Sequence, residues 1–223
     1  MLVLITFTLG KKYFHKYYMM SMSNSLQVFD NFLDSAEFNK LAELVLGPKF
    51  PWFFGEHVSL DPSDSALIKD PLAKETWGFH HSVFEQEWNV KSFTYEYLQP
   101  FFEKINKEFG FTQQHLVRAR LSLKFQKQGF TSDNYNIPHV DYFFPHESFI
   151  FYLNDSDGDT RIFNEWATST GTLPLGPDLF TTQSRVTPKA NRLVWINGLQ
   201  YHTASNPIES TNRVIINLNL LPL

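Results

Sequence analysis

The chain has 223 residues, which is enough for one domain with a sizeable hydrophobic core. Hydrophobic residues make up 43% of the sequence and include 23 Phe, 9 Tyr and 5 Trp, so a disordered or collagen-like protein is excluded. The formal net charge of -4 gives no reason to expect tight binding to nucleic acid, and the lack of cysteine excludes disulfides, thiolate metal sites and a cysteine nucleophile.

The N-terminal segment carries no pattern of a membrane anchor or a secretion signal. Residues 1–10 are apolar, but they span about half the length of a membrane helix, and Lys11 and Lys12 follow them instead of preceding them. We therefore expect no membrane association and a cytoplasmic location in the producing or host cell. Residues 1–24 are interpreted as an N-terminal extension or a peripheral strand, and residues 25–223 as a single domain.

The first predicted helix covers residues 35–46. Asp34 has the character of an N-cap, Glu37 follows three residues later, and Gly47 closes the segment.

A second helical stretch is predicted over residues 92–109, in which Pro100 kinks or restarts the helix and Gly110 ends it. Its spacing predicts one apolar side, formed by Phe93, Tyr97, Phe101, Phe102, Ile105 and Phe109. Residues 48–90 show no sustained period, and we expect irregular structure with short strands there. The two helices are expected to support one face of a sheet.

From about residue 115 the pattern changes to the period of two that is typical of strands. Residues 117–125 alternate apolar with polar or charged side chains. Further short strands are predicted at 147–154, 159–164, 184–188, 191–196, 200–204 and 212–221. Many short strands predict a β-sandwich or barrel over residues 115–223, with residues 25–114 as its helical and irregular support.

A candidate metal site combines His139 and Asp141 with the distant His202. Side chains two apart on a strand point the same way, so the first pair can reach one point, and a third ligand must come from another strand. Two imidazoles and one carboxylate suit non-haem Fe(II), with three coordination positions left open. A His-x-Asp pair also occurs as a simple hydrogen-bonded pair without metal. His146 competes as third ligand, although Pro145 beside it favours a turn at the surface or the rim.

Arg213 is a candidate anion-binding residue in the last predicted strand. Ile215, Asn217 and Asn219 share its face, and the residues of the opposite face are apolar. A buried guanidinium needs an anion, and its planar fork matches a carboxylate with two parallel hydrogen bonds. The alternative is a structural salt bridge to an acidic side chain of the chain itself.

These residues together resemble the 2-oxoglutarate/Fe(II)-dependent oxygenase superfamily, and within it the prolyl 4-hydroxylase-like branch, including forms common in phages and marine microbes. The similarity covers about residues 117–221, with a weaker match in the strand before the first helix. The motifs that carry it are Val28–Leu33, Leu121–Phe125, Gly129, Tyr135, His139–Asp141, Phe149–Asn154, Asp157–Thr160, Pro188–Trp195, Gly198, His202 and Arg213.

The resemblance implies a mainly β double-stranded β-helix, a jelly-roll or cupin-like barrel, buttressed by N-terminal helices. It implies Fe(II), 2-oxoglutarate and dioxygen as cofactors and cosubstrates, with ascorbate as a candidate reductant. The metal ligands are His139, Asp141 and His202, and the resemblance implies no further catalytic residue. The resemblance also implies four residues that bind the cosubstrate, namely Arg213, Tyr152, Thr160 and Asn217. Of these, Tyr152 and Arg213 are expected to contact its distal carboxylate.

Three positions depart from the pattern of many prolyl hydroxylases. Phe125 stands where they have a tyrosine, so one hydrogen bond to the cosubstrate is expected to be missing. Arg213 stands where many have lysine, and Gly158-Asp159 replaces a pair of glycines, which leaves the geometry of that turn open.

The leading function is hydroxylation of a C–H bond, with a prolyl residue of a peptide or protein as first substrate. A free amino acid or other small metabolite is the alternative substrate, and the mild acidity disfavours a nucleic acid. A non-catalytic jelly-roll binding or virion-associated module is the alternative of another class. Such a module has no physical need for three metal ligands and a buried arginine together.

Overall fold

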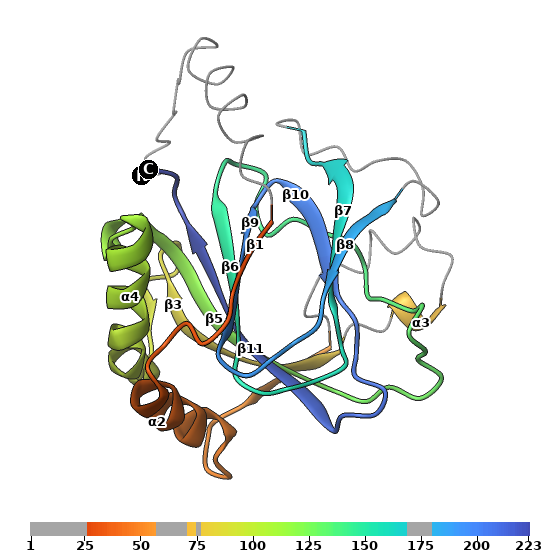
Figure 1. Ribbon diagram of the computed structural model, residues 1–223, viewed down its shortest axis with the longest axis horizontal. Helices are drawn as coiled ribbons and strands as arrows, with labels where there is room; N and C mark the ends of the chain where they lie inside the picture. The colour runs from red at the N-terminus through yellow and green to blue at the C-terminus, as the bar shows by residue number, and fades with distance from the viewer. Residues whose placement is uncertain (1–25, 57–70, 75–76, 169–179) are drawn as a thin grey trace.

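The computed structural model describes residues 26–56, 71–74, 77–168 and 180–223. Two antiparallel sheets face each other, and two helices lie against the outside of the larger sheet (Figure 1). The sheets are not closed into a continuous barrel. The predicted jelly roll with flanking helices is confirmed, whereas the predicted extension over residues 1–24 lies outside the described residues.

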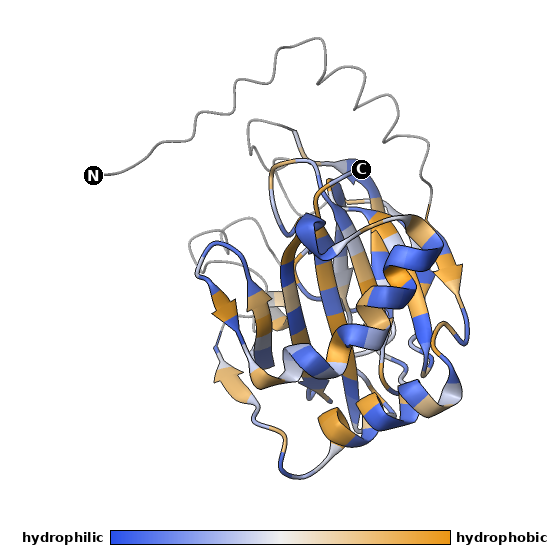
Figure 2. Cartoon of the chain, turned by 90° about the vertical axis from the view of Figure 1, so that its left-hand side faces the viewer, coloured by the Kyte–Doolittle hydropathy of each residue, from blue (hydrophilic) through white to orange (hydrophobic). Residues whose placement is uncertain are grey.

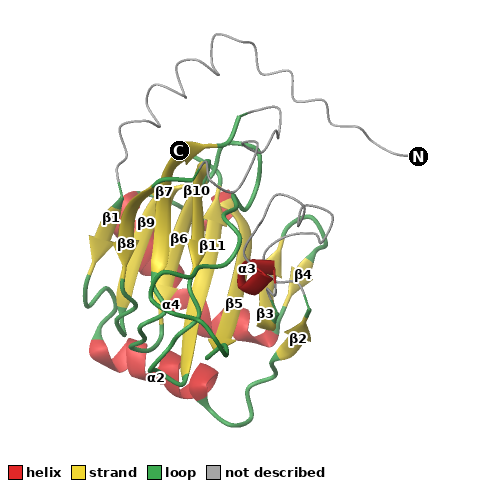
Figure 3. Ribbon diagram, turned by 90° about the vertical axis from the view of Figure 1, so that its right-hand side faces the viewer, coloured by secondary structure: helices red, strands yellow, loops and turns green. Residues whose placement is uncertain are grey.

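The larger sheet has eight strands in the order β1-β9-β6-β11-β5-β3-β2, with β4 paired to β3 (Figure 3). The smaller sheet has the order β10-β7-β8. The strands are β1 (Gln27–Phe29), β2 (Phe53–Gly55), β3 (Gly78–Glu85), β4 (Val90–Lys91), β5 (Leu116–Phe125), β6 (Glu147–Tyr152), β7 (Thr160–Trp166), β8 (Thr182–Val186), β9 (Arg192–Asn197), β10 (Gln200–Ala204) and β11 (Asn212–Leu220). Every strand predicted after residue 115 is therefore present, with ends shifted by one or two residues in most cases.

The main difference from the expected elements lies in residues 48–90, for which only short strands were expected. β3 is eight residues long and pairs with β5, so this segment extends the larger sheet beyond the jelly-roll strands. Residues 57–70 and 75–76 of the same segment are outside the described part of the chain. The short α3 (Pro71–Lys74) lies between them.

The helix α2 (Ser35–Leu46) has the predicted bounds. The second helical stretch divides as the proline suggested, into a 3-10 helix over Phe93–Leu98 and α4 (Gln99–Phe109), with Pro100 in the first turn. Gly110 ends α4 in the left-handed conformation, at a φ of 83°. A further 3-10 turn covers Gln113–His115.

The predicted apolar side of the second stretch is wrong at its start. Phe93 and Tyr97 are both 55% exposed, and Tyr95 and Leu98 are buried instead. The reason is the 3-10 turn, which has about three residues per turn and so rotates the side chains away from the face that an α-helix would have presented.

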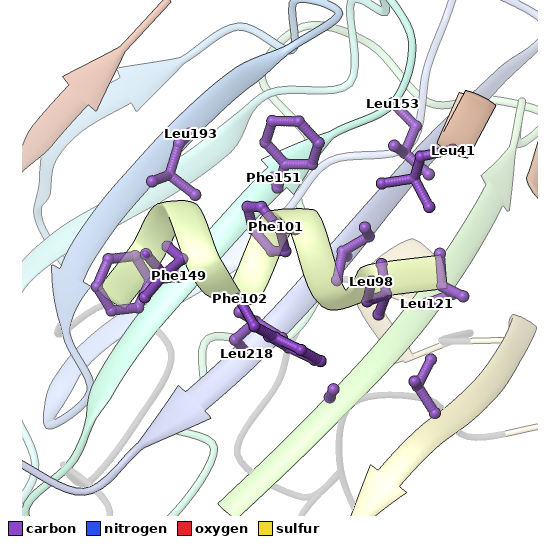
Figure 4. Packing of buried hydrophobic residues seen from close by; sticks show 14 of the residues in the cluster. Leu41, Leu98, Phe101, Phe102, Leu121, Phe149, Phe151, Leu153, Leu193 and Leu218 are labelled. Carbon is purple, nitrogen blue, oxygen red and sulfur yellow. The ribbon is translucent and has the colours of Figure 1, made fainter. Parts of the chain in front are cut away.

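The main hydrophobic core lies between the two helices and the outer face of the larger sheet. Figure 2 shows both helices in front of that face. Phe101 of α4 lies against Phe151 of β6, and the centroids of the two rings are 4.7 Å apart (Figure 4). Four strands of the sheet contribute alternate residues to this core, among them Ala119, Leu121 and Leu123 of β5, Phe149 and Phe151 of β6, Leu193 of β9, and Val214, Ile216, Leu218 and Leu220 of β11.

The other face of the same strands points between the two sheets. Arg213 pairs with Lys124 across β11 and β5, Asn217 with Arg120, and Asn219 with Arg118. Paired residues in antiparallel strands share a face, so the polar half of the β5 alternation lines the interior of the sandwich. No helix in the described residues is both long and apolar enough to cross a bilayer.

Candidate metal centre and anion pocket

The three predicted metal ligands come together between the sheets. His139 lies beside β10, where its backbone amide donates to the carbonyl of His202 at 2.9 Å and its carbonyl accepts from the amide of His202 at 3.0 Å. One ligand atom each from His139, Asp141 and His202 lies within 4.8 Å of the other two. His139 and His202, 63 positions apart in the sequence, thus meet through a short bridge at the edge of the smaller sheet.

Each imidazole is oriented by the backbone carbonyl group of the residue two positions before it in the sequence. The Nδ1 atoms of His139 and His202 lie 3.0 Å from the carbonyl oxygens of Ile137 and Gln200, respectively. A carbonyl only accepts hydrogen bonds, so each Nδ1 carries the proton and each Nε2 is left as a ligand atom. The Nε2 atom of His202 lies 3.8 Å from a carboxylate oxygen of Asp141. Burial, together with His202, lowers the pKa of His139 to about 4, which keeps this ring in its neutral, metal-binding form at pH 7.

Asp141 is held by four polar side chains that the sequence analysis did not single out for this role. Its carboxylate forms an ion pair with Arg118 and accepts hydrogen bonds from the amides of Asn217 at 3.1 Å and Asn219 at 2.8 Å. Ser148 donates from 3.5 Å. Burial alone would raise the pKa of Asp141, but the charge of Arg118 outweighs this effect and holds the pKa well below its usual range. A ligating carboxylate with this support stays ionised and fixed in direction.

A cavity of about 60 Å³ runs beside these ligands. His139, Asp141 and His202 line it together with Arg213. The other polar residues of its wall are Arg120, Ser122, Lys124, Thr160, Thr203 and Asn217. The candidate metal site and the predicted anion site are therefore parts of one pocket.

Arg213 is 2% exposed and is held mainly by hydroxyl groups. Its Nη2 donates to the hydroxyl of Thr160 at 2.8 Å, and the hydroxyls of Thr160 and Tyr152 lie 2.6 Å apart. The Nε atom of Arg213 has no hydrogen-bond partner. The alternative of a structural salt bridge thus has no support here, because no acidic side chain in the described residues pairs with this guanidinium.

The four predicted cosubstrate residues have different places in this pocket. Thr160 lines the cavity beside Arg213, whereas the Tyr152 hydroxyl lies behind Thr160 and is fully buried. Asn217 lines the cavity at its other end, where its amide contacts Asp141. The structure therefore brings Tyr152, Thr160 and Arg213 together and puts Asn217 beside the metal ligands.

The turn at Gly158 packs closely under Arg213. A Cβ atom on Gly158 would lie 2.7 Å from the carbonyl oxygen of Ser205 and 3.1 Å from Cδ of Arg213. One glycine is thus enough for this close approach, and Asp159, the second residue of the pair, forms an ion pair with Arg185 at 2.9 Å.

Two residues lie elsewhere than expected. His146, expected at the surface or rim, is 1% exposed and packs so tightly on Gly198 that a Cβ there would lie 2.2 Å from its ring. It is not part of the cluster of ligand atoms. Phe125, expected at the cosubstrate, faces the outer core instead, where its ring contacts that of Phe79 at 5.9 Å. The β5 residue that faces the pocket at this level is Lys124.

The donor set fits the groups that the resemblance implies. Two imidazole nitrogen donors and one carboxylate on one side of a cavity match a Fe(II) site with open positions. Buried cationic atoms without partners, Nε of Arg213 and Nζ of Lys124, match a ligand with a free carboxylate.

No protein-family model and no curated protein sequence matches the chain. Solved structures do match it. The non-haem alpha-ketoglutarate-dependent epimerase SnoN from nogalamycin biosynthesis aligns over 95% of this chain and 84% of its own, with a TM-score of 0.56 and 13% identity. An oxidoreductase of the 2OG-Fe(II) oxygenase family from Burkholderia pseudomallei aligns over 92% and 90%, with a TM-score of 0.55 and 12% identity.

A prolyl hydroxylase from Trichoplax adhaerens, in complex with a peptide fragment of the hypoxia inducible factor oxygen degradation domain, aligns over 96% of this chain and 94% of its own. Its TM-score is 0.52 and its identity 13%. At these identities the likeness concerns the fold. The chain has the fold of 2-oxoglutarate- and Fe(II)-dependent oxygenases, so the resemblance expected from the motifs is confirmed at that level.

Proposed function

We propose that the chain is a non-haem Fe(II)- and 2-oxoglutarate-dependent dioxygenase that hydroxylates a C–H bond. One observation carries the proposal. Two imidazoles and a carboxylate converge within 4.8 Å at one part of a cavity whose wall also holds a buried arginine without a carboxylate partner. A purely structural site has no reason to bury that guanidinium beside three metal ligands, because an uncompensated buried charge is costly.

The roles of the residues follow from their contacts. His139, Asp141 and His202 would hold the metal, and Arg118, Asn217 and Asn219 fix the carboxylate among them. Bound Fe(II), together with 2-oxoglutarate and dioxygen, supplies the oxidant for the C–H bond, with succinate and carbon dioxide as by-products.

The remaining pocket residues bind and orient the cosubstrate. Arg213 would pair with its distal carboxylate, while Thr160 and Tyr152 keep the guanidinium in position. We assign no general acid or base, because Asp141 is occupied as a ligand and held ionised. The buried walls of the pocket limit the access of water, which protects a reactive intermediate from side reactions.

For the substrate we propose a prolyl residue of a peptide or protein. The motifs that resemble the prolyl 4-hydroxylase-like branch favour it, and a prolyl hydroxylase with a bound peptide fragment is among the structures that share the fold. A free amino acid or other small metabolite is the alternative, because an epimerase and a carbocyclase from nogalamycin biosynthesis also share the fold. Release of succinate in the presence of each class of compound would decide between them.

Anaerobic titration tests the function itself. The apo-protein is titrated with Fe(II) and then with 2-oxoglutarate, and we expect the weak visible charge-transfer band of a 2-oxo acid bound to Fe(II). Arg213→Ala should weaken 2-oxoglutarate binding much more than iron binding, and His139→Ala should remove iron binding. A protein that shows no band and binds neither component would contradict the proposal and favour a non-catalytic binding module.

A further inference from the structure

A second buried cation lies next to Arg213 in the pocket. Lys124 and Arg213 are direct partners across β5 and β11, so their side chains leave the sheet on the same face. Both line the cavity, and their exposed fractions are 7% and 2%. Position 124 follows the period of two that gives β5 one apolar and one polar face.

Neither cation forms an ion pair with an acidic side chain in the described part of the chain. The Nζ atom of Lys124 and the Nε atom of Arg213 have no hydrogen-bond partner. The carboxylate that lines the same cavity, that of Asp141, is engaged with Arg118 and two asparagine amides. The charged groups whose electrostatic interaction with Lys124 is strongest are all cations, namely Arg213, Arg120 and Lys127.

This arrangement is unfavourable unless an anion is bound. Like charges directly opposite each other on paired strands destabilise a sheet, and burial adds the cost of removing an ammonium group from water. Burial, together with the charge of Arg213, lowers the pKa of Lys124 to about 7. An apolar side chain of similar length would fill the same space without that cost, so the lysine has a reason to be there only if it meets a negative ligand.

We propose that Lys124 and Arg213 together hold the distal carboxylate of 2-oxoglutarate, so that Lys124 is a cosubstrate-binding residue that determines selectivity for a diacid. This inference rests on the proposed function of the pocket. One carboxylate between an ammonium and a guanidinium can accept charge-assisted hydrogen bonds from both sides, with Thr160 fixing the guanidinium. Phe125, which stands where many prolyl hydroxylases have a tyrosine, faces the opposite side of the strand.

The proposed role of Lys124 predicts a difference between the binding of a diacid and the binding of a monoacid. 2-Oxopentanoate has the same carbon chain and the same 2-oxo acid group as 2-oxoglutarate but lacks the distal carboxylate. Lys124 should therefore contribute to binding of the diacid and not to binding of the monoacid. A residue with a merely structural role would change the affinity for both acids by the same factor.

The experiment is calorimetric titration of the Fe(II)-loaded protein with each acid under anaerobic conditions. We expect Lys124→Met to weaken 2-oxoglutarate binding by at least about tenfold and to leave 2-oxopentanoate binding unchanged. The apo form of Lys124→Met should unfold at no lower temperature than the wild type, because the variant removes a buried unpaired charge. If Lys124→Met does not fold, Lys124→Gln is titrated with the same two acids, and the same difference between them is expected.

Lys127→Met is the matched control, because Lys127 is also buried but donates to the carbonyl of Leu72 and does not line the cavity. It should keep the wild-type ratio of the two affinities. If Lys124→Met binds 2-oxoglutarate as tightly as the wild type, or loses affinity for both acids equally, the role of Lys124 is wrong while the proposed function stands. A wild type that binds neither acid overturns the proposed function, and this inference with it.

Discussion

On β5 the side chains of Ala119, Leu121 and Leu123 face the helices, and those of Arg120, Ser122 and Lys124 face the pocket. The same division holds on β11, where apolar and polar residues alternate in the same register. The outer face is a close-packed apolar layer covered by α2 and α4. The inner face carries several buried cations and hydrogen-bonded amides. Each strand thus serves two environments with opposite chemical demands.

This difference separates stability from binding. On the outer face each buried side chain removes apolar area from water and stabilises the fold. On the inner face, burial of Lys124 and Arg213 opposes folding and is compensated when a ligand binds. Substitutions on the outer face should therefore change the free energy of unfolding, and those on the inner face should change ligand affinity.

The largest effect is expected for His202→Ala. The variant removes one of the three proposed metal ligands, and the backbone bridge between residues 139 and 202 needs no imidazole. We expect Fe(II) binding to fall below detection when it is measured by titration calorimetry under anaerobic conditions. The circular dichroism spectrum of the variant should remain that of the folded wild type. Iron affinity equal to that of the wild type would show that the metal is held elsewhere.

A large effect of the other kind is expected for Phe151→Ala on the outer face. Phe151 is fully buried and stacks on Phe101, so its truncation should lower the free energy of unfolding by about 3–5 kcal/mol. At a temperature where the variant is folded, its affinity for Fe(II) and 2-oxoglutarate should equal that of the wild type. Denaturant unfolding measures the free energy of unfolding, and calorimetry measures the two affinities. A loss of affinity would contradict the claim that the outer face affects stability and not ligand binding.

The smallest effect is expected at Glu147, a carboxyl group on the outer side of β6. Burial raises its pKa to about 7, although the indole of Trp195 donates a hydrogen bond to it at 2.8 Å. In this pH range the folded state holds a proton that the unfolded state has released. The contribution to stability is therefore fully present below about pH 4.5 and is lost as the pH rises through 7, by on the order of 2 kcal/mol.

Glu147→Gln should remove that part of the pH dependence. Denaturant unfolding of both proteins between pH 5 and 8 measures it, with the wild type losing stability relative to the variant as the pH rises. Parallel curves would show that this carboxyl ionises in the folded state as readily as in the unfolded chain.

Much of this organisation could be predicted from local sequence patterns. The helix over residues 35–46 has both end signals, and β11 alternates so regularly that the face shared by Arg213 and Asn217 followed from the period alone. The convergence of His139, Asp141 and His202 followed from ligand chemistry and spacing. These features depend on neighbours in the sequence or on a known chemical constraint.

The remainder depends on contacts that no local pattern contains. The long strand β3 gains its stability by pairing with β5, some forty residues away. The burial of His146 depends on Gly198 of another segment. Alternation on β5 separated two faces, but both faces are buried in a jelly roll, so the pattern could not tell that Lys124 faces a pocket and Phe125 the outer core.

The most direct test of the account is a crystal structure of the protein grown anaerobically with Mn(II) and 2-oxoglutarate. We expect the metal on His139, Asp141 and His202, and the far carboxylate of the diacid against Arg213 and Lys124. A metal bound at other residues, or a diacid whose far carboxylate points away from both cations, would contradict the account.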